Sequence, residues 1–293
     1  MLRSERRGLH GLTEAFRNLI GRIENLLWLN ARGRRSLVVM FFRQLLNDDS
    51  ACASYLLGCK TKQRFAVVDP HVDLVDEYIA LAGTQGIPIV AVLETHVQAD
   101  HVSGLPVLVE RTGATAYLPA GAGVEFEHVP LGDGAVVDLG NTKLRAIATP
   151  GHAPAHHAYL VTDLTRGEEP WMVLTGDALL VGDAGRPDLH AGAADSAESM
   201  ARTLYRSLTE RLLSLPDHLL LYPAHYSGSV CGRGLSANPA STIGFERSHS
   251  PALRFDSEEA FVEALLRDLP PAPERQPEIV AANRSGRPLV PSG

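Results

Sequence analysis

Short apolar runs and longer amphipathic stretches alternate along the chain from residue 40 onward. The short runs are bounded by glycine or by Asp-Pro, a pattern that predicts buried strands. The longer stretches repeat apolar residues every three or four positions, which predicts helices. The predicted strands cover residues 53–57, 65–68, 88–93, 114–118, 135–139, 143–149, 157–161, 171–174 and 219–222. The predicted helices cover residues 72–82, 102–111, 196–213 and 255–269.

This order of elements places helices between strands in both halves of residues 40–269. Such an α/β order predicts one domain in which two sheets lie back to back, with helices on their outer faces. Residues 270–293 begin with Pro270-Pro271-Ala272-Pro273 and are polar and proline-rich. We therefore expect this C-terminal tail to be a mobile arm.

A basic segment, residues 1–39, precedes the predicted domain. Between Leu9 and Leu27 its apolar residues recur at helical spacing, which predicts an amphipathic helix. Residues 1–35 contain eight arginines and three glutamates, and a basic amphipathic helix can lie on a membrane or dock on a partner. Two other interpretations stay open. The helix packs on its own domain or on a second subunit, or translation begins at Met40.

Composition narrows the class of protein. The 293 residues are 45% hydrophobic and 21% charged, which is typical of soluble globular proteins. No apolar run approaches the roughly 18–20 residues that a transmembrane segment needs. The whole chain has a net charge of −7, and since residues 1–35 carry +5, the remainder carries −7 − 5 = −12. Such an acidic body argues against nucleic-acid binding. Three cysteines without CxxC spacing and no signal-peptide pattern predict a cytoplasmic protein without disulfides.

Histidines and carboxylates gather at four points, each directly after a predicted strand. Loops in this position hold polar side chains on a rigid scaffold, and imidazole and carboxylate are groups that bind zinc or iron(II). A lone histidine is more often a packed or surface residue, but four clusters in one chain favour a metal site. The clusters contain His96, Asp100, His101, Gly151-His152, Gly176-Asp177 and Ala224-His225.

The motif T-H-V-Q-A-D-H at residues 95–101 and the three later clusters resemble the metal-binding motifs of the metallo-β-lactamase superfamily. The resemblance covers about residues 40–269. It implies an αβ/βα sandwich with two central mixed β-sheets flanked by helices. Carried over by position, it implies a first metal site of His96, His152 and Asp177. It implies a second site of Asp100, His101 and His225, with Asp177 bridging the two.

Gln98 departs from this family pattern, because it stands where the family has the second histidine of H-x-H. A glutamine amide is a weak ligand, so a tetrahedral zinc in the first site would lose a strong donor. The remaining set, His96, His152 and Asp177, has the composition of the two-histidine, one-carboxylate triad of non-haem iron(II) oxygenases. The alternative is that Gln98 is a drifted residue in a degraded site.

A narrower resemblance supports iron. The stretch G-D-A-L-L-V-G-D-A-G-R-P-D-L at residues 176–189 is similar to the signature of persulfide dioxygenases, and residues 225–253 resemble the subgroup often fused to rhodanese domains. The resemblance implies one Fe(II) per chain, held by His96, His152 and Asp177. Around it, four further residues would support these ligands or hold a second metal. They are Gln98, Asp100, His101 and His225.

Arg186, Asp188 and Tyr226 are the candidate substrate residues. The Arg186 guanidinium suits a carboxylate or a sulfur-bound oxyanion, so we predict catalytic roles for Arg186 and Asp188 and a substrate contact for Arg186. The alternative is an Arg–Asp pair that braces the loop presenting Asp177. Tyr226 is predicted to contact the substrate. It stands where the glutathione-using branch has an aspartate, which leaves the carrier thiol open.

The resemblance implies a persulfide dioxygenase that oxidises a low-molecular-weight thiol persulfide, such as glutathione persulfide, with O₂ to sulfite and thiol. The alternative is a dinuclear Zn(II) hydrolase, a glyoxalase-II-like thioesterase, in which a metal-bound hydroxide attacks a carbonyl. A third possibility is a non-catalytic descendant that uses the fold for binding. The resemblance is compatible with a homodimer, and the sequence leaves open whether a separate sulfurtransferase is a partner.

Overall fold

The first of two six-stranded sheets contains the N-terminal half of the domain, in the order β1 to β6. Its strands are β1 (Phe41–Asn47), β2 (Cys52–Cys59), β3 (Arg64–Val68), β4 (Ile89–Leu93), β5 (Thr115–Pro119) and β6 (Val129–Leu131). The β1, β2 and β3 strands pair antiparallel, and β3 to β6 pair parallel. The computed structural model describes residues 40–287 apart from 191–195, 268, 270 and 274. The predictions for residues 1–39 therefore lie outside the described residues.

The second sheet contains the remaining strands in the order β12-β11-β10-β9-β8-β7. They are β7 (Val136–Asp138), β8 (Thr142–Ala148), β9 (His157–Asp163), β10 (Met172–Gly176), β11 (Leu220–Pro223) and β12 (Ser241–Thr242). Only β10 and β11 pair parallel among these neighbours, and the other pairs are antiparallel. Both sheets are therefore mixed, as the sequence predicts.

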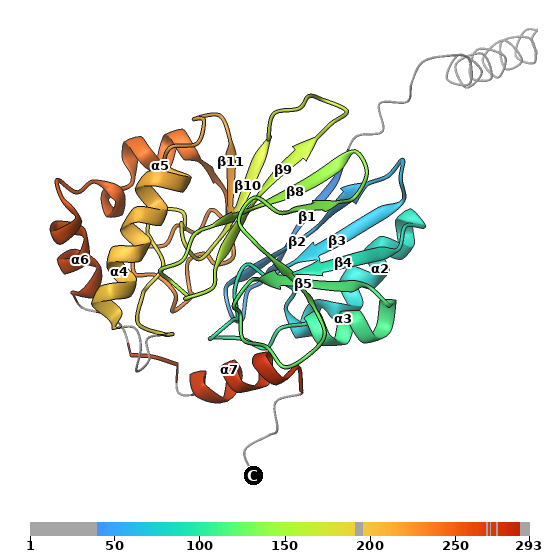
Figure 1. Cartoon of the computed structure of the whole chain (residues 1–293), viewed down its shortest axis with the longest axis horizontal. Helices are drawn as coiled ribbons and strands as arrows, with labels where there is room; N and C mark the ends of the chain where they lie inside the picture. The colour runs from blue at the N-terminus through green and yellow to red at the C-terminus, as the bar shows by residue number, and fades with distance from the viewer. Residues whose placement is uncertain (1–39, 191–195, 268, 270, 274, 288–293) are drawn as a thin grey trace, which may run out of the picture. The chain divides into compact units, whose positions relative to one another are not determined.

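Three clusters of buried apolar side chains hold the layers of the domain together, one between the two sheets and one on the outer face of each sheet. Between the sheets, Tyr55 and Leu57 of β2 belong to the same buried cluster as Tyr159 and Val161 of β9. Because side chains alternate along a strand, Leu56 belongs instead to the cluster outside the first sheet. There it packs with α2 (Val75–Gln85) and α3 (Leu105–Thr112). On the outer face of the second sheet lie α4 (Ala197–Arg206), α5 (Ile243–His249) and α6 (Glu258–Leu266) (Figure 1).

Helix boundaries differ from the predictions where the local chemistry differs from simple periodicity. The helix predicted over residues 72–82 begins as a 3₁₀ turn, Val72–Leu74, and continues in α2 to Gln85. It ends at Gly86, whose φ of 63° is the left-handed cap that glycine favours. The helix predicted over 196–213 is α4 followed by a π-helical turn, Ser207–Leu212. The structure also contains β1, β6, β12 and α5, which are too short or too irregular in pattern to be predicted.

The structure of the C-terminal tail contradicts the prediction that the tail is a mobile arm. Residues Gln276–Ser285 form α7, with Ile279 and Asn283 buried. The proline-rich composition hid this short helix, in which the apolar residues Ile279 and Val280 and the polar Asn283 face the domain. Asn283 hydrogen-bonds the backbone of the loop after β4. None of the helices in the described part of the chain is long and apolar enough to cross a membrane.

Candidate metal centre

Four loops bring the predicted metal-binding residues together at one end of the sandwich. His96 follows β4, His152 lies between β8 and β9, Asp177 follows β10, and His225 follows β11. Short backbone bridges join these loops to each other and to the sheets, including His96 to His156 and Cys52 to His225. The strand ends therefore set the positions of side chains that lie far apart in the sequence.

His96, His152 and Asp177 lie around one point. The Asp177 Oδ2 atom is 3.4 Å from His152 Nε2 and 3.9 Å from His96 Nε2. The two imidazole rings meet edge to face, with centroids 4.8 Å apart. All three side chains are at most 1% exposed. The structure thus brings together the three residues predicted to hold the metal.

The outer ring nitrogens of both histidines are held by hydrogen bonds. His152 Nδ1 donates to the carbonyl oxygen of Arg186 at 2.8 Å. His96 Nδ1 lies 2.9 Å from Thr95 Oγ1, which itself donates to the carboxylate of Asp69 at 3.0 Å. This chain places the ring protons on Nδ1 and leaves both Nε2 lone pairs facing Asp177. Such anchoring is what orients metal-ligating histidines.

The protonation states of this group suit a divalent transition metal. Burial, reinforced by neighbouring histidines, holds the pKa of His96 well below its usual range, and burial lowers the pKa of His152. Burial alone would raise the pKa of Asp177, but His225 outweighs it and lowers that pKa. Two neutral imidazoles therefore face an ionised carboxylate. Among the described residues, His152 Nε2 and Asp177 Oδ2 are buried without a hydrogen bond, as atoms reserved for a metal would be.

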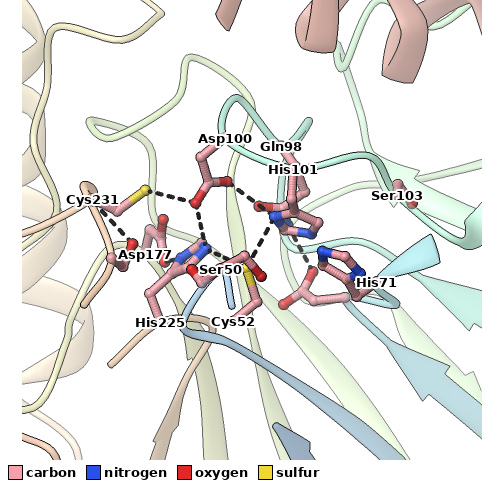
Figure 2. A network of polar contacts seen from close by, with 12 residues as sticks. Ser50, Cys52, His71, Gln98, Asp100, His101, Ser103, Asp177, His225 and Cys231 are labelled. Carbon is pink, nitrogen blue, oxygen red and sulfur yellow. Dashed lines mark hydrogen bonds and ion pairs between the residues drawn. The ribbon is translucent and has the colours of Figure 1, made fainter. Parts of the chain in front are cut away.

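Asp100, His101 and His225 form a second group beside the first (Figure 2). Asp100 lies between the two histidines, 3.0 Å from His101 Nδ1 and 2.8 Å from His225 Nε2. His225 Nδ1 also lies 2.6 Å from Asp177 Oδ1 and so connects the two groups. Burial opposes a charge on His225, but Asp100 and Asp177 raise its pKa well above its usual range.

Two cysteines also lie here, which the sequence did not predict. Cys52 Sγ is 3.3 Å from His101 Nδ1 and 3.3 Å from His225 Nε2. Burial would raise the pKa of this thiol, but His101 and His225 outweigh burial and lower the pKa to about 7. Cys231 Sγ lies 3.6 Å from Asp100 Oδ2. Sequence spacing carries no signal for Cys52, because its contacts depend on β2 lying beside the loop after β11.

Gln98 directs its amide nitrogen toward two buried acids. Its Nε2 lies 3.3 Å from Glu94 Oε2 and 3.4 Å from Asp69 Oδ1. Burial raises the pKa of Asp69 to about 6, and burial together with Asp69 raises that of Glu94 well above its usual range. Gln98 therefore supplies N–H groups to a buried pair of carboxyls. This contact accounts for an amide at the position where the family has a histidine.

Arg186 and Asp188 pair closely. Arg186 Nε and Nη2 donate to the two carboxylate oxygens of Asp188 at 2.8 and 2.7 Å, and the Arg186 side chain is 3% exposed. Its Nη1 also lies 3.3 Å from two backbone oxygens. This geometry favours the interpretation in which the pair braces the loop. Tyr226 donates its hydroxyl to Asp48 at 2.7 Å. The catalytic and substrate roles of these three residues stay predictions.

A further imidazole near the first group was also not predicted. His190 directly follows the G-R-P-D-L stretch, and its ring centroid is 5.8 Å from that of His152 and 6.2 Å from that of His96. Burial and the neighbouring His152 lower the pKa of His190 to about 3. The loop reaches this point because Gly185 has no side chain, since a Cβ there would overlap the carbonyl oxygen of Asp177.

Comparisons with known proteins agree with this geometry. Residues 47–225 match the family model of the metallo-β-lactamase superfamily. The mitochondrial persulfide dioxygenase ETHE1 of Bos taurus is 30% identical, over 83% of this chain and 87% of that protein. The crystal structure of ETHE1 from Myxococcus xanthus superposes with a TM-score of 0.72 at 32% identity, over 84% of this chain and 99% of that one. A hydroxyacylglutathione hydrolase of Pseudomonas entomophila is 32% identical, over 68% of this chain and 81% of that protein. The chain therefore belongs to the metallo-β-lactamase superfamily, within which it is similar to the persulfide dioxygenases.

Proposed function

We propose that this protein is a mononuclear non-haem iron persulfide dioxygenase. The observation that carries the proposal is the donor set, in which two neutral imidazoles and one carboxylate converge while Gln98 faces Glu94 and Asp69. Two histidines and one carboxylate are the set that holds iron(II) in non-haem oxygenases. The likeness to persulfide dioxygenases gives independent support.

In the proposed reaction a thiol persulfide, such as glutathione persulfide, reacts with O₂ and water to give sulfite, the thiol and two protons. The S–S bond breaks, and the terminal sulfur gains both oxygen atoms of O₂ and one from water. Iron(II) held by His96, His152 and Asp177 supplies the site at which sulfur and O₂ meet.

The surrounding residues keep the three ligands in place and the site dry. The carbonyl of Arg186 sets the ring of His152, so the Arg186–Asp188 pair acts in this proposal as a positioning pair. Thr95, held by Asp69, sets the ring of His96. His225 donates to Asp177 and holds its second oxygen away from the imidazoles. The near-complete burial of the ligands excludes water, which strengthens their electrostatic interaction with a cation.

A dinuclear zinc thioesterase is the second candidate. The observation that favours it is the second group, because the ligand atoms of Cys52, Asp100, His101 and His225 all lie within 4.8 Å of one another. Thiolate, imidazole and carboxylate together make a suitable zinc site. The likeness to a hydroxyacylglutathione hydrolase points the same way.

Metal analysis and oxygen uptake separate the two candidates. For protein purified without air, we expect about one iron per chain and oxygen consumption that depends on glutathione persulfide, with sulfite as the product. The same preparation should not hydrolyse S-lactoylglutathione. Two zinc ions per chain with thioester hydrolysis and no persulfide-dependent oxygen uptake would overturn the proposal.

Replacing Gln98 with histidine tests whether this position is a ligand. Since the Gln98 amide contacts Glu94 and Asp69, we expect Gln98→His to keep oxygen uptake within about tenfold of the wild type, less than the 10- to 100-fold typical of groups that orient ligands. Gln98→Glu, of equal size, is the contrasting variant. It adds a carboxyl beside two buried ones and should lower the melting temperature. Complete loss of activity in Gln98→His would assign Gln98 a role at the metal.

A further inference from the structure

We propose that His190 is a fourth protein ligand, which completes the metal site of His96, His152 and Asp177 in place of the imidazole that the family has at position 98. This inference rests on the proposed metal site, and it adds a residue from a different loop to that site. The ligand is a divalent transition metal ion.

Three imidazoles, those of His96, His152 and His190, converge. The ligand atoms of His96, His152 and His190 all lie within 4.8 Å of one another. The ring of His190 stands edge-on to both other rings, at interplanar angles of 82° and 76°. Hydrogen bonding does not explain why the three imidazoles approach one point, because none of the three rings donates to another in the described structure.

His190 also carries a buried nitrogen without a partner. His190 Nε2 is buried without a hydrogen bond, as are His152 Nε2 and Asp177 Oδ2, in the part of the chain that the structure describes. A buried polar atom without a partner costs free energy, and such atoms are uncommon in folded proteins. One metal ion held by His96, His152 and His190 would satisfy the Nε2 atoms of His152 and His190 together.

Packing fixes the loop that carries His190. The carbonyl oxygen of Leu189 accepts a hydrogen bond from Gln276 of α7 at 2.5 Å. The Leu189 side chain is buried with Ala99 and Cys231, and Val280 of α7 packs against them. Contacts of both the backbone and the side chain of Leu189 therefore hold the next residue, His190, at the site.

His190 compensates for the absence of an imidazole at position 98. Gln98 uses its amide to bind Glu94 and Asp69 and offers the first metal group no imidazole. His190 restores the number of imidazoles to three, from the loop that follows Asp177 rather than from the loop after β4. Four protein donors bind a divalent metal more tightly than three, and they leave fewer positions for exogenous ligands.

The test counts imidazoles on the bound metal. The full-length protein is stripped with a chelator, loaded without air with one equivalent of Fe(II), and measured by X-ray absorption. We expect outer-shell scattering from three imidazoles in the wild type and from two in His190→Gln. The dissociation constant for Fe(II) should rise at least about tenfold in the variant, since even groups that only orient ligands are worth 10- to 100-fold. His218→Gln, which removes an exposed histidine far from these loops in sequence, should match the wild type.

Two imidazoles in the wild type would overturn the assignment without any variant, so the test does not depend on how His190→Gln folds. An equal count and equal affinity in wild type and variant would also overturn it. The readout is independent of the reaction. Three imidazoles without persulfide-dependent oxygen uptake would reject the proposed dioxygenase activity and support His190 as a ligand. Oxygen uptake with only two imidazoles would support the dioxygenase activity and reject His190 as a ligand.

Discussion

Replacing His152 with alanine is expected to abolish both metal binding and catalysis. The Nε2 atom of His152 is 3.4 Å from Asp177 Oδ2 and has no hydrogen bond among the described residues. Without it, Asp177 and His96 face a cavity instead of a ligand. Partners that merely orient a ligand are worth 10- to 100-fold in metal affinity or activity, so loss of the ligand should cost more than about 100-fold. Metal content after gel filtration and oxygen uptake measure the two losses.

His157→Ala is the matched control for this experiment. His157 is also a buried histidine and begins β9, a few residues after His152, but it does not belong to the groups that could hold a metal. We expect this variant to keep its metal and to lose only stability. If His152→Ala instead bound a full equivalent of iron, either His96, Asp177 and His190 would suffice to hold the metal, or the metal would lie in the second group, with Asp100, His101 and His225.

The strands and the clusters of histidine and carboxylate that follow them could be predicted from the sequence for one physical reason, whereas the assignment of these residues to metal sites came from the resemblance to the metallo-β-lactamase superfamily. Buried strands are short apolar runs, and a histidine or aspartate directly after such a run is carried to the rim of a sheet. His96, Asp177 and His225 each follow a strand in this way. Their convergence needs only that the two sheets pack face to face, which the buried apolar faces enforce.

His190 and Cys52 could not be predicted by the same reasoning. Neither follows a strand end, and each reaches the site through contacts between distant parts of the chain. The position of Cys52 depends on the backbone bridge that joins it, at the start of β2, to His225. His190 depends on α7, nearly ninety residues later, because Gln276 holds Leu189. The local sequence pattern does not indicate such long-range contacts. The prolines before α7 also kept this helix from being predicted.

Asn283 of α7 is expected to be among the most sensitive positions outside the metal site. Its Oδ1 accepts from the backbone N–H of Ser103 at 2.9 Å, and its Nδ2 donates to the carbonyl oxygens of Gln98 and His101 at 3.0 and 2.9 Å. Asn283→Ala leaves three buried backbone groups without partners. At about 1 kcal/mol for each lost hydrogen bond, the free energy of unfolding should fall by about 3 kcal/mol. For a domain of this size that lowers the melting temperature by roughly 6–12 °C.

Glu278→Ala distinguishes this effect from a general weakening of α7. Glu278 lies on the exposed side of the same helix and pairs with Arg275. An exposed pair of this kind contributes about 0–1 kcal/mol, so the control should melt within about 2–4 °C of the wild type. Hydrogen exchange gives a second readout, because the amide of Ser103 should exchange faster in Asn283→Ala alone. Equal melting temperatures in the two variants would mean that α7 does not hold the loop that carries Asp100 and His101. Since that loop also carries His96, a large difference would instead show that the C-terminal helix stabilises the metal centre from outside both sheets.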